Sequence, residues 1–161
     1  MRSTPRQPLI RLIDEVTRLR GRLQSVFADA SAATGLAPME STVLTAVVKS
    51  GTAPTVSQIG RSLGHPRQVI QRATNNLIAA RLLQTAANPS HKRALLLRAT
   101  PAGRRRYRDA EAIGRKAAAS FTRLLNRKEC DRLADELHAL RGRIETHLRA
   151  RERVTKTGAR D

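Results

Sequence analysis

The chain has 161 residues, of which 40% are apolar and 27% charged, and its formal net charge is +18. This length suits one domain of ordinary size with its own hydrophobic core. Only three residues are aromatic, which argues against an aromatic-rich β-sandwich and favours packed helices. The single cysteine, Cys130, excludes an intrachain disulfide framework and a zinc cluster built from thiolates.

The charges are unevenly distributed along the chain. All thirteen acidic residues lie outside residues 41–108, a stretch that holds twelve Lys and Arg. A continuous positive field attracts phosphate groups at long range, so we expect a nucleic-acid partner. The alternative is a basic composition scattered over a soluble domain. No apolar run reaches the roughly 18 residues that span a bilayer, and charges interrupt residues 9–15, where a signal core would lie. We therefore expect no membrane partner and a cytoplasmic, nucleoid-associated protein.

A long amphipathic helix is the first predicted element. Apolar residues alternate at steps of three and four, which is typical of a helix with a heptad face. They are Leu9, Leu12, Val16, Leu19, Leu23, Val26 and Ala30. Thr34 and Gly35 end this helix, Pro38 begins a second one, and Gly51 closes the second.

Two short helices around a tight turn are predicted next. Thr55 and Gln58 have the spacing of a capping box, in which each side chain satisfies the other residue's backbone amide. The helix that they start ends at Gly64, and His65 or Pro66 begins another. Inward-facing residues of that helix recur at steps of three and four, at Ile70, Ala73 and Leu77. This order predicts a helix-turn-helix.

A hairpin and two more helices complete the expected fold. The short apolar runs 82–86 and 94–98 flank a polar, basic turn, which indicates a β-hairpin. Thr100 and Pro101 start a helix to about residue 125, and a last helix begins near Lys128. The fold class is mainly α with a small β-hairpin wing. We expect a flexible basic N-terminus at 1–8, an N-terminal dimerisation helix at 9–35, a DNA-binding lobe at 36–100, C-terminal dimerisation helices at 101–150 and a flexible basic tail at 151–161.

Three segments carry a resemblance to a known family. They are residues 55–64, residues 66–72 and residues 92–103, in this order and spacing. The chain resembles the MarR family of bacterial winged helix-turn-helix transcription regulators over about residues 9–150. In that family the wing usually carries two acidic residues with an arginine between them; here Asn88, His91 and Ser90 stand at those places, and only the final arginine, Arg93, is kept. Arg81 stands where the family tends to have glycine after the recognition helix, so Arg81 either adopts a left-handed backbone or ends the helix differently.

The candidate DNA-binding residues follow from how a helix-turn-helix presents its second helix to the major groove. Residues away from the inward face can reach base edges, and Arg suits guanine while Gln suits adenine. The predicted major-groove residues are Arg67, Gln68, Gln71 and Arg72; the predicted wing residues are His91, Lys92 and Arg93; and the predicted phosphate contacts are Thr55, Ser57 and Arg104. A solvated helix face and a solvated hairpin tip are the alternatives, and for Thr55 so is capping alone.

The apolar faces at both ends of the chain predict a homodimer, because one small lobe cannot bury them all. The expected dimerisation residues are Leu12, Val16, Leu19, Leu133, Leu137, Leu140 and Ile144. Packing of these faces within one monomer is the alternative. A dimer would place two recognition helices about 34 Å apart on an inverted repeat.

Other chemistry is not supported by the sequence. Cys130 near the start of the last helix suits either a redox sensor or an ordinary thiol. His138 and His147 are nine residues apart on one helix, too far to bind a metal together. No phosphate loop, nucleophile elbow or paired carboxylates occur, so we expect no enzyme and no cofactor.

The resulting hypothesis is a homodimeric, sequence-specific regulator of transcription that binds double-stranded DNA. The resemblance implies a repressor and a pocket for a small-molecule effector, whose residues no motif identifies. Two alternatives remain: a nucleoid-type architectural protein that binds DNA without sequence preference, and a protein-binding adaptor whose lobe has lost DNA function. A large gap between specific and random-site affinity separates the regulator from the architectural protein, and an adaptor would show no salt-dependent DNA binding.

Overall fold

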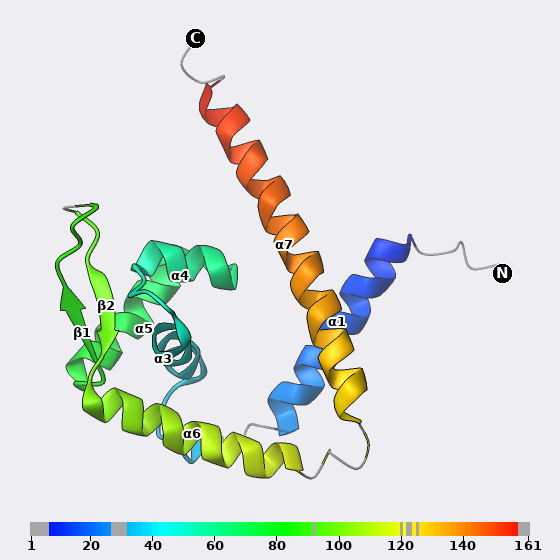
Figure 1. The fold of residues 1–161 in the computed structure, drawn as a ribbon, viewed down its shortest axis with the longest axis horizontal. Coiled ribbons are helices and arrows are strands. Elements are labelled where there is room, and N and C mark those ends of the chain that lie inside the picture. The colour runs from blue at the N-terminus through cyan, green and yellow to red at the C-terminus, as the bar shows by residue number, and fades with distance from the viewer. Residues whose placement is uncertain are drawn as a thin grey trace. The chain divides into compact units, whose positions relative to one another are not determined.

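The computed structural model describes residues 7–26, 32–91, 93–119, 121, 124 and 126–157. The chain divides into two compact units, residues 1–117 and residues 118–161, and each is described by itself. The first unit contains α1 (Pro8–Val26), α3 (Pro38–Lys49), α4 (Val56–Leu63), α5 (Arg67–Ala79), β1 (Leu83–Ala86), β2 (Leu96–Ala99) and most of α6 (Pro101–Ala119); α7 (Arg127–Thr157) belongs to the second. Figure 1 labels these elements. The predicted fold class, mainly α with a small β-hairpin wing, is confirmed.

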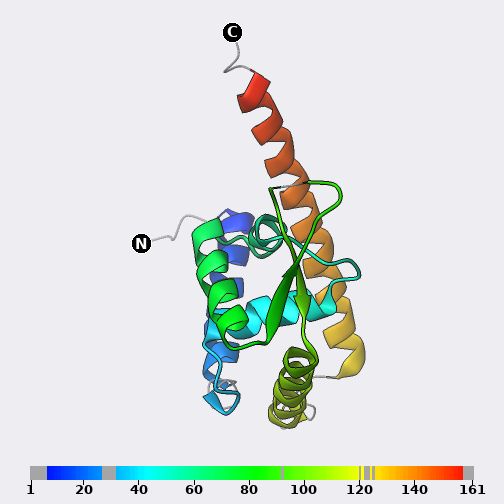
Figure 2. The ribbon, with the colours of Figure 1, turned by 90° about the vertical axis from the view of Figure 1, so that its left-hand side faces the viewer.

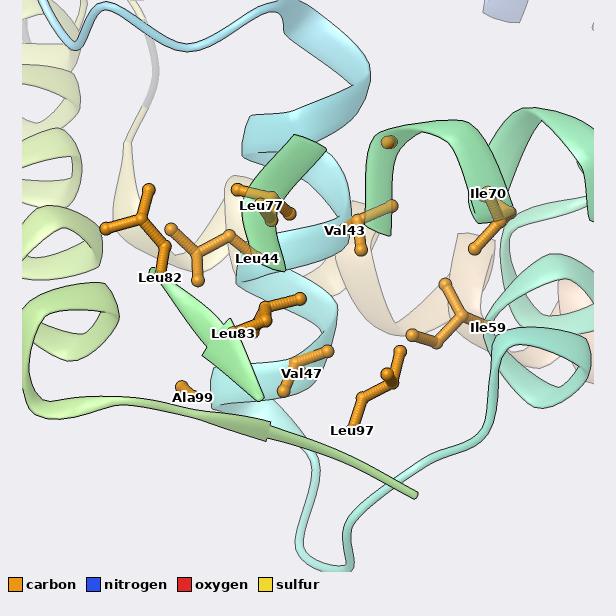
Figure 3. Close-up of a cluster of buried hydrophobic side chains, with 11 residues drawn as sticks. Val43, Leu44, Val47, Ile59, Ile70, Leu77, Leu82, Leu83, Leu97 and Ala99 are labelled. Atoms are coloured by element: carbon orange, nitrogen blue, oxygen red, sulfur yellow. The ribbon is translucent and has the colours of Figure 1, made fainter. Parts of the chain in front are cut away.

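The hydrophobic core lies in the lobe formed by α3, α4, α5 and the hairpin. Helix α3 passes through its middle, with α5 on one side and the two strands on another (Figure 3). Branched aliphatic side chains dominate this core, as the sparse aromatic content predicts, and each contributes roughly 1.5–3 kcal/mol through burial. The core residues are Val43, Leu44, Val47, Ile59, Ile70, Ala73, Leu77, Leu82, Leu83, Leu97 and Ala99.

The helix-turn-helix forms because both ends of α4 are capped. Thr55 accepts a hydrogen bond from the Gln58 amide at 3.3 Å, and the Gln58 side chain accepts one from the Thr55 amide at 2.7 Å. At the other end Gly64 has φ 67°, and the His65 amide donates to the Gly60 carbonyl at 2.9 Å. Glycine tolerates this left-handed conformation without a steric cost, so the chain turns sharply into α5. The capping box and the break predicted from the sequence are both confirmed.

Arg81 ends α5 in a left-handed conformation, with φ 57°. The Arg81 amide donates to the Ile78 carbonyl at 2.9 Å, and the Leu82 amide donates to the Leu77 carbonyl at 2.8 Å. These two bonds are the Schellman pattern that glycine usually completes. Of the two outcomes expected for a non-glycine residue here, the structure shows the left-handed one. The recognition helix therefore ends as it would with glycine, although the backbone of Arg81 is strained.

The wing is a two-stranded antiparallel sheet in which Leu83 pairs with Ala99 and Ala86 pairs with Leu96. The strands turn Leu83 and Leu97 toward the core, while Gln84 and Arg98, opposite one another, face outward. The Leu97 amide also donates to the Pro54 carbonyl at 2.8 Å, so β2 is bonded to the segment that precedes α4. The helix-turn-helix and the wing are therefore parts of one packed lobe.

Helix α6 leaves the base of the hairpin, at the opposite end from the wing loop (Figures 1 and 2). Arg106 donates a hydrogen bond from Nη1 to the carbonyl of Thr34, just before α3. Tyr107 packs against the core and donates its hydroxyl to Glu111 at 2.9 Å. The pKa of Tyr107 is raised, mainly because the side chain is partly buried. The pKa of Glu111 is lowered, mainly because Glu111 accepts the hydrogen bond from Tyr107.

Some predicted boundaries differ from the structure. Helix α7 continues through Thr157, past residue 151, where the predicted tail begins. The reason is local: residues 151–157 include good helix formers such as Arg and Glu, and the next glycine or proline is Gly158. The first helix begins at Pro8. Its predicted last turn, at residues 27–30, and part of the predicted helix beyond Ala119 lie outside the described residues.

Candidate nucleic-acid interface

Helix α5 presents a polar, basic face opposite its buried side. Ile70, Ala73 and Leu77 point into the core with at most 4% of each residue exposed. Three of the four predicted major-groove residues, Arg67, Gln68 and Arg72, are exposed, and Gln71 is half-buried. An exposed first turn of this composition at the second helix of a helix-turn-helix is able to reach base edges in a major groove.

Asn75 extends this face and was not among the predicted residues. It is exposed one turn after Gln71, and its Oδ1 accepts a hydrogen bond from Gln71 Nε2 at 2.9 Å. One face of a helix holds residues four apart, so the i, i+4 spacing in the sequence was the signal that could have found it. The bond leaves Gln71 Oε1 and Asn75 Nδ2 as an adjacent acceptor and donor on the helix surface.

The wing loop is organised by Asn88. Its side chain accepts a hydrogen bond from the Ser90 amide at 3.0 Å and donates one to the Ala94 carbonyl at 2.9 Å. His91 and Arg93 are exposed in this loop, and Lys92 lies outside the described residues. Asn88 stands where the family usually has a carboxylate, and the neutral amide bonds to both sides of the loop. It does so without a negative charge, which would repel phosphate groups.

The two residues predicted at the start of α4 have different environments. Thr55 is buried, its hydroxyl donates to Gln58 Oε1 at 3.0 Å, and it pairs with Leu96 as an isolated bridge. A hydroxyl has one proton, so in this arrangement Thr55 cannot also donate to a phosphate. This geometry favours the capping alternative for Thr55 over a phosphate contact. Ser57 is half-buried in the first turn of α4 and remains a candidate.

Arg104 is exposed in the first turn of α6, at the base of the hairpin. The base adjoins the end of α5, because Leu82 follows that helix and its carbonyl accepts a bond from the Thr100 amide at 3.1 Å. Arg67 begins the same helix, which has 13 residues. At about 1.5 Å per residue, the length of α5 therefore separates the two ends by about 20 Å. The structure does not bring Arg104 together with the predicted major-groove residues.

Glu40 is the one carboxylate between Asp29 and Asp109, and it faces α5. Its Oε1 accepts a hydrogen bond from Asn76 Nδ2 at 2.8 Å, and its Oε2 accepts one from the Ala37 amide at 3.0 Å. This pair could not be predicted from the sequence, because residues 36 apart in the chain give no local signal. Its negative charge sits beside the last turn of α5, away from the basic first turn.

The predicted dimerisation residues form exposed apolar faces on α1 and α7. On α1 the exposed fraction is 38% for Leu12 and 55% for Leu19, and Val16 lies between them. On α7, Leu133, Leu137 and Ile144 are exposed to a similar degree and Leu140 is half-buried. Monomeric proteins rarely expose contiguous apolar surface of this kind.

The residues considered for other chemistry lie apart. Cys130 is exposed, and His138 Nδ1 lies 3.2 Å from Arg141 Nη2. Within the described ranges, no group of three or more His, Cys, Asp or Glu is placed to hold a metal ion. Over the same ranges, no helix is both long enough and apolar enough to cross a membrane.

Comparison with known proteins gives one family and one fold. Residues 34–94, which contain the helix-turn-helix and most of the wing, match the model of the MarR family. A search of the curated proteins finds no significant match. Many solved structures share the fold. A MarR-family transcriptional regulator from Rhodococcus sp. RHA1 aligns with a TM-score of 0.74 and 19% identity over 84% of this chain and 96% of its own.

Two structures of the protein CouR are also similar. CouR from Rhodococcus jostii RHA1 bound to p-coumaroyl-CoA aligns with a TM-score of 0.69 and 21% identity over 78% of this chain and 88% of its own. The transcriptional repressor CouR bound to a 23-mer DNA duplex aligns with a TM-score of 0.68 and 23% identity over 78% of this chain and 89% of its own. At these identities the likeness establishes the fold.

The match of residues 34–94 to the family model is consistent with the fold of nearly the whole chain. Members of the family are DNA-binding transcription regulators and not enzymes, so the predicted class of function is confirmed. The resemblance to the MarR family of winged helix-turn-helix transcription regulators that the sequence predicted is therefore confirmed by the family model over residues 34–94, and the solved structures extend the shared fold to most of the chain.

Proposed function

We propose that the chain is a homodimeric regulator that binds an inverted repeat in double-stranded DNA and represses transcription. The observation that carries this proposal is the polar face of α5. Arg67, Gln68 and Arg72 are exposed there, over a fully buried inner side, in a stretch of sequence without carboxylates. Arg and Gln form bidentate pairs with guanine and adenine, and each good pair is worth roughly 1–3 kcal/mol of discrimination. This face reads bases, and Arg93 with His91 on the wing contacts backbone or minor groove.

The dimer is proposed from the exposed apolar faces of α1 and α7. One lobe offers a single recognition helix, and a single module buries little DNA surface. A two-fold dimer presents two such helices about 34 Å apart, which matches successive major grooves on one side of a duplex. Association through Leu12, Val16 and Leu19, and through the matching residues of α7, also removes apolar surface from water.

The sign of regulation and the effector are proposed by analogy with CouR. That protein is a transcriptional repressor, and structures of it are bound to a DNA duplex and to p-coumaroyl-CoA. By this analogy the chain is a repressor that a small organic ligand releases from its operator. The identities to CouR, 23% and 21%, carry no assignment of the same ligand.

An architectural DNA-binding protein is the second candidate, because the same positive field supports binding without sequence preference. Both candidates predict that affinity falls steeply with salt, since each neutralised phosphate releases counterions. Only the regulator predicts a large gap between operator and random DNA.

The deciding experiment is selection of binding sites from a random duplex library at about physiological salt. The winning sequence and a scrambled duplex of the same length are then compared by equilibrium titration. We expect an enriched inverted repeat bound at least about a thousandfold more tightly than the scrambled duplex. Tight, salt-sensitive binding to all duplexes with no enriched motif would replace the regulator with the architectural protein. If the protein shows no salt-dependent binding to any duplex, the remaining alternative is the protein-binding adaptor.

A further inference from the structure

Thr100 is the centre of a joint between the recognition helix and α6. Its hydroxyl donates to the Arg81 carbonyl at 2.7 Å and lies 3.2 Å from the Leu82 carbonyl. The same oxygen accepts a hydrogen bond from the Gly103 amide at 3.0 Å, and the Thr100 amide donates to the Leu82 carbonyl at 3.1 Å. One side chain therefore caps α6 and at the same time bonds to the residue that ends α5.

Gly103 closes this joint sterically. A Cβ at this position would stand 2.0 Å from the Leu82 carbonyl oxygen and 3.0 Å from the Leu82 carbonyl carbon. The first turn of α6 therefore rests directly on the backbone that leaves the recognition helix. Because the backbone of Gly103 contacts the backbone of Leu82 directly, no flexible side chain lies between them that could adjust to a movement. A displacement of α6 therefore has to displace Leu82 as well.

The other side of the joint is equally constrained. Arg81 holds its left-handed conformation while its amide and that of Leu82 bond back into the last turn of α5. Leu82 is buried in the core. The path from the last turn of α5 to the first turn of α6 thus runs through bonded backbone groups, with Thr100 as the side chain that joins them.

We propose that this joint sets the orientation of the recognition helix relative to α6, and that Thr100 is a positioning residue for base recognition. The inference rests on the proposed function. Bases are discriminated only when Arg67 and its neighbours meet them in one geometry, whereas attraction to phosphate tolerates changes of angle. Loosening the joint therefore lowers specific binding and leaves random-site binding almost unchanged.

The test compares three variants with the wild type on the selected operator and on a scrambled duplex. Thr100→Val keeps the shape of the side chain and removes its hydroxyl; Thr100→Ser keeps the hydroxyl. Thr85→Val, at an exposed position of β1, is the matched control. We expect Thr100→Val to reduce the ratio of specific to random affinity at least about tenfold, with random-site affinity within about twofold of wild type. Thr100→Ser and Thr85→Val are expected to keep the ratio.

Equal losses on both duplexes, or an unchanged ratio in Thr100→Val, would overturn the positioning role. If Thr100→Val fails to fold, amide hydrogen exchange of the wild-type protein still tests the joint. The amides of Leu82 and Gly103 are expected to exchange as slowly as those of the α5 core. Exchange as fast as at the exposed end of α6 would mean that the joint opens independently, and the inference would fail. If the wild-type protein binds the operator and the scrambled duplex equally well, the proposed function is contradicted instead. The hydrogen-exchange rates of Leu82 and Gly103 then test the rigidity of the joint by themselves.

Discussion

Arg81 carries a steric cost that glycine would not, because its Cβ crowds the backbone at φ 57°. Arg81→Gly should therefore raise the free energy of unfolding by about 1 kcal/mol. The measurement is the midpoint of urea unfolding, followed by circular dichroism. Ala80→Gly is the matched control, because Ala80 has φ −75° and gains nothing from glycine. The control should lower stability by about 0.5–1 kcal/mol. A midpoint of Arg81→Gly at or below the wild-type value would show that contacts of the arginine side chain compensate the strain.

Two glycines of α6 should respond in opposite ways to the same substitution. Gly103→Ala forces a methyl group against the Leu82 carbonyl and should destabilise the fold by at least about 2 kcal/mol. Gly114→Ala meets nothing within 4 Å and should stabilise it by about 0.5–1 kcal/mol, because alanine favours the helix. Thermal unfolding of both variants checks this. Similar melting temperatures for the two would contradict the close approach of α6 to Leu82.

At the scale of elements, the recognition helix and the wing should contribute differently to DNA binding. Arg67→Ala should relax base preference at one position and cost about 1–3 kcal/mol on the operator, with little change on scrambled DNA. Arg93→Ala on the wing should weaken binding to both duplexes alike and lower the salt slope by about one. Lys92→Ala is expected to resemble the wing variant. Titrations at several salt concentrations measure both quantities, and equal losses on every duplex from Arg67→Ala would refute base recognition by α5.

Helix α6 contains a pair whose effect depends on pH. The hydrogen bond from Tyr107 lowers the pKa of Glu111, so the ionised carboxylate stabilises the fold. This contribution is complete above the ordinary pKa of Glu, about 4.3, and is lost as the pH falls through the lower value of the folded state. Tyr107→Phe should raise the pKa of Glu111 and reduce stability near neutral pH. The difference from wild type should shrink in acid.

The carboxyl resonance of Glu111 in an NMR titration reports the pKa directly. Urea unfolding at neutral and acidic pH tests the stability change. Glu111→Gln in the wild-type background is the control, because it removes the titrating group and should abolish the pH dependence that Tyr107→Phe alters. An unchanged pKa in Tyr107→Phe would assign the shift to the ion pair with Arg115, 3.0 Å away.

The sequence predicted elements well where local chemistry decided them. The capping box at Thr55 and the break at Gly64 fixed the helix-turn-helix, and the steps of three and four identified the inner side of α5. Features that depend on distant groups were not predictable. Nothing local to Gly103 indicates that Leu82 lies against it, and nothing in the wing sequence indicates that Asn88 would bond to Ala94. For Thr55 the alternative of capping alone was already open from the sequence, and the structure favours it, because the hydroxyl donates to Gln58 Oε1.

At the scale of the whole molecule, the exposed apolar faces predict that the folded state depends on association. Val16→Asp on α1 and Leu137→Asp on α7 each place a charge on such a face, and each should shift the protein toward monomer. Sedimentation velocity over a range of concentrations measures the shift. Arg18→Asp is the control, because Arg18 lies well away from the apolar stripe of α1. A monomeric wild type, or no difference among these variants, would remove the basis for a dimer.

Tyr107 is the only tyrosine of the chain, which has no tryptophan. The Tyr107 ring packs against the core, and its hydroxyl donates a hydrogen bond to the Glu111 carboxylate. Tyr107 lies one turn after Gly103 in α6. All tyrosine emission of the protein therefore originates at a single site, and a carboxylate that accepts a hydrogen bond from an excited phenol is an efficient quencher. The unlabelled protein thus contains its own optical reporter of α6. A change in its intensity on addition of duplex or of a candidate effector would report movement at this helix without a dye or a mutation.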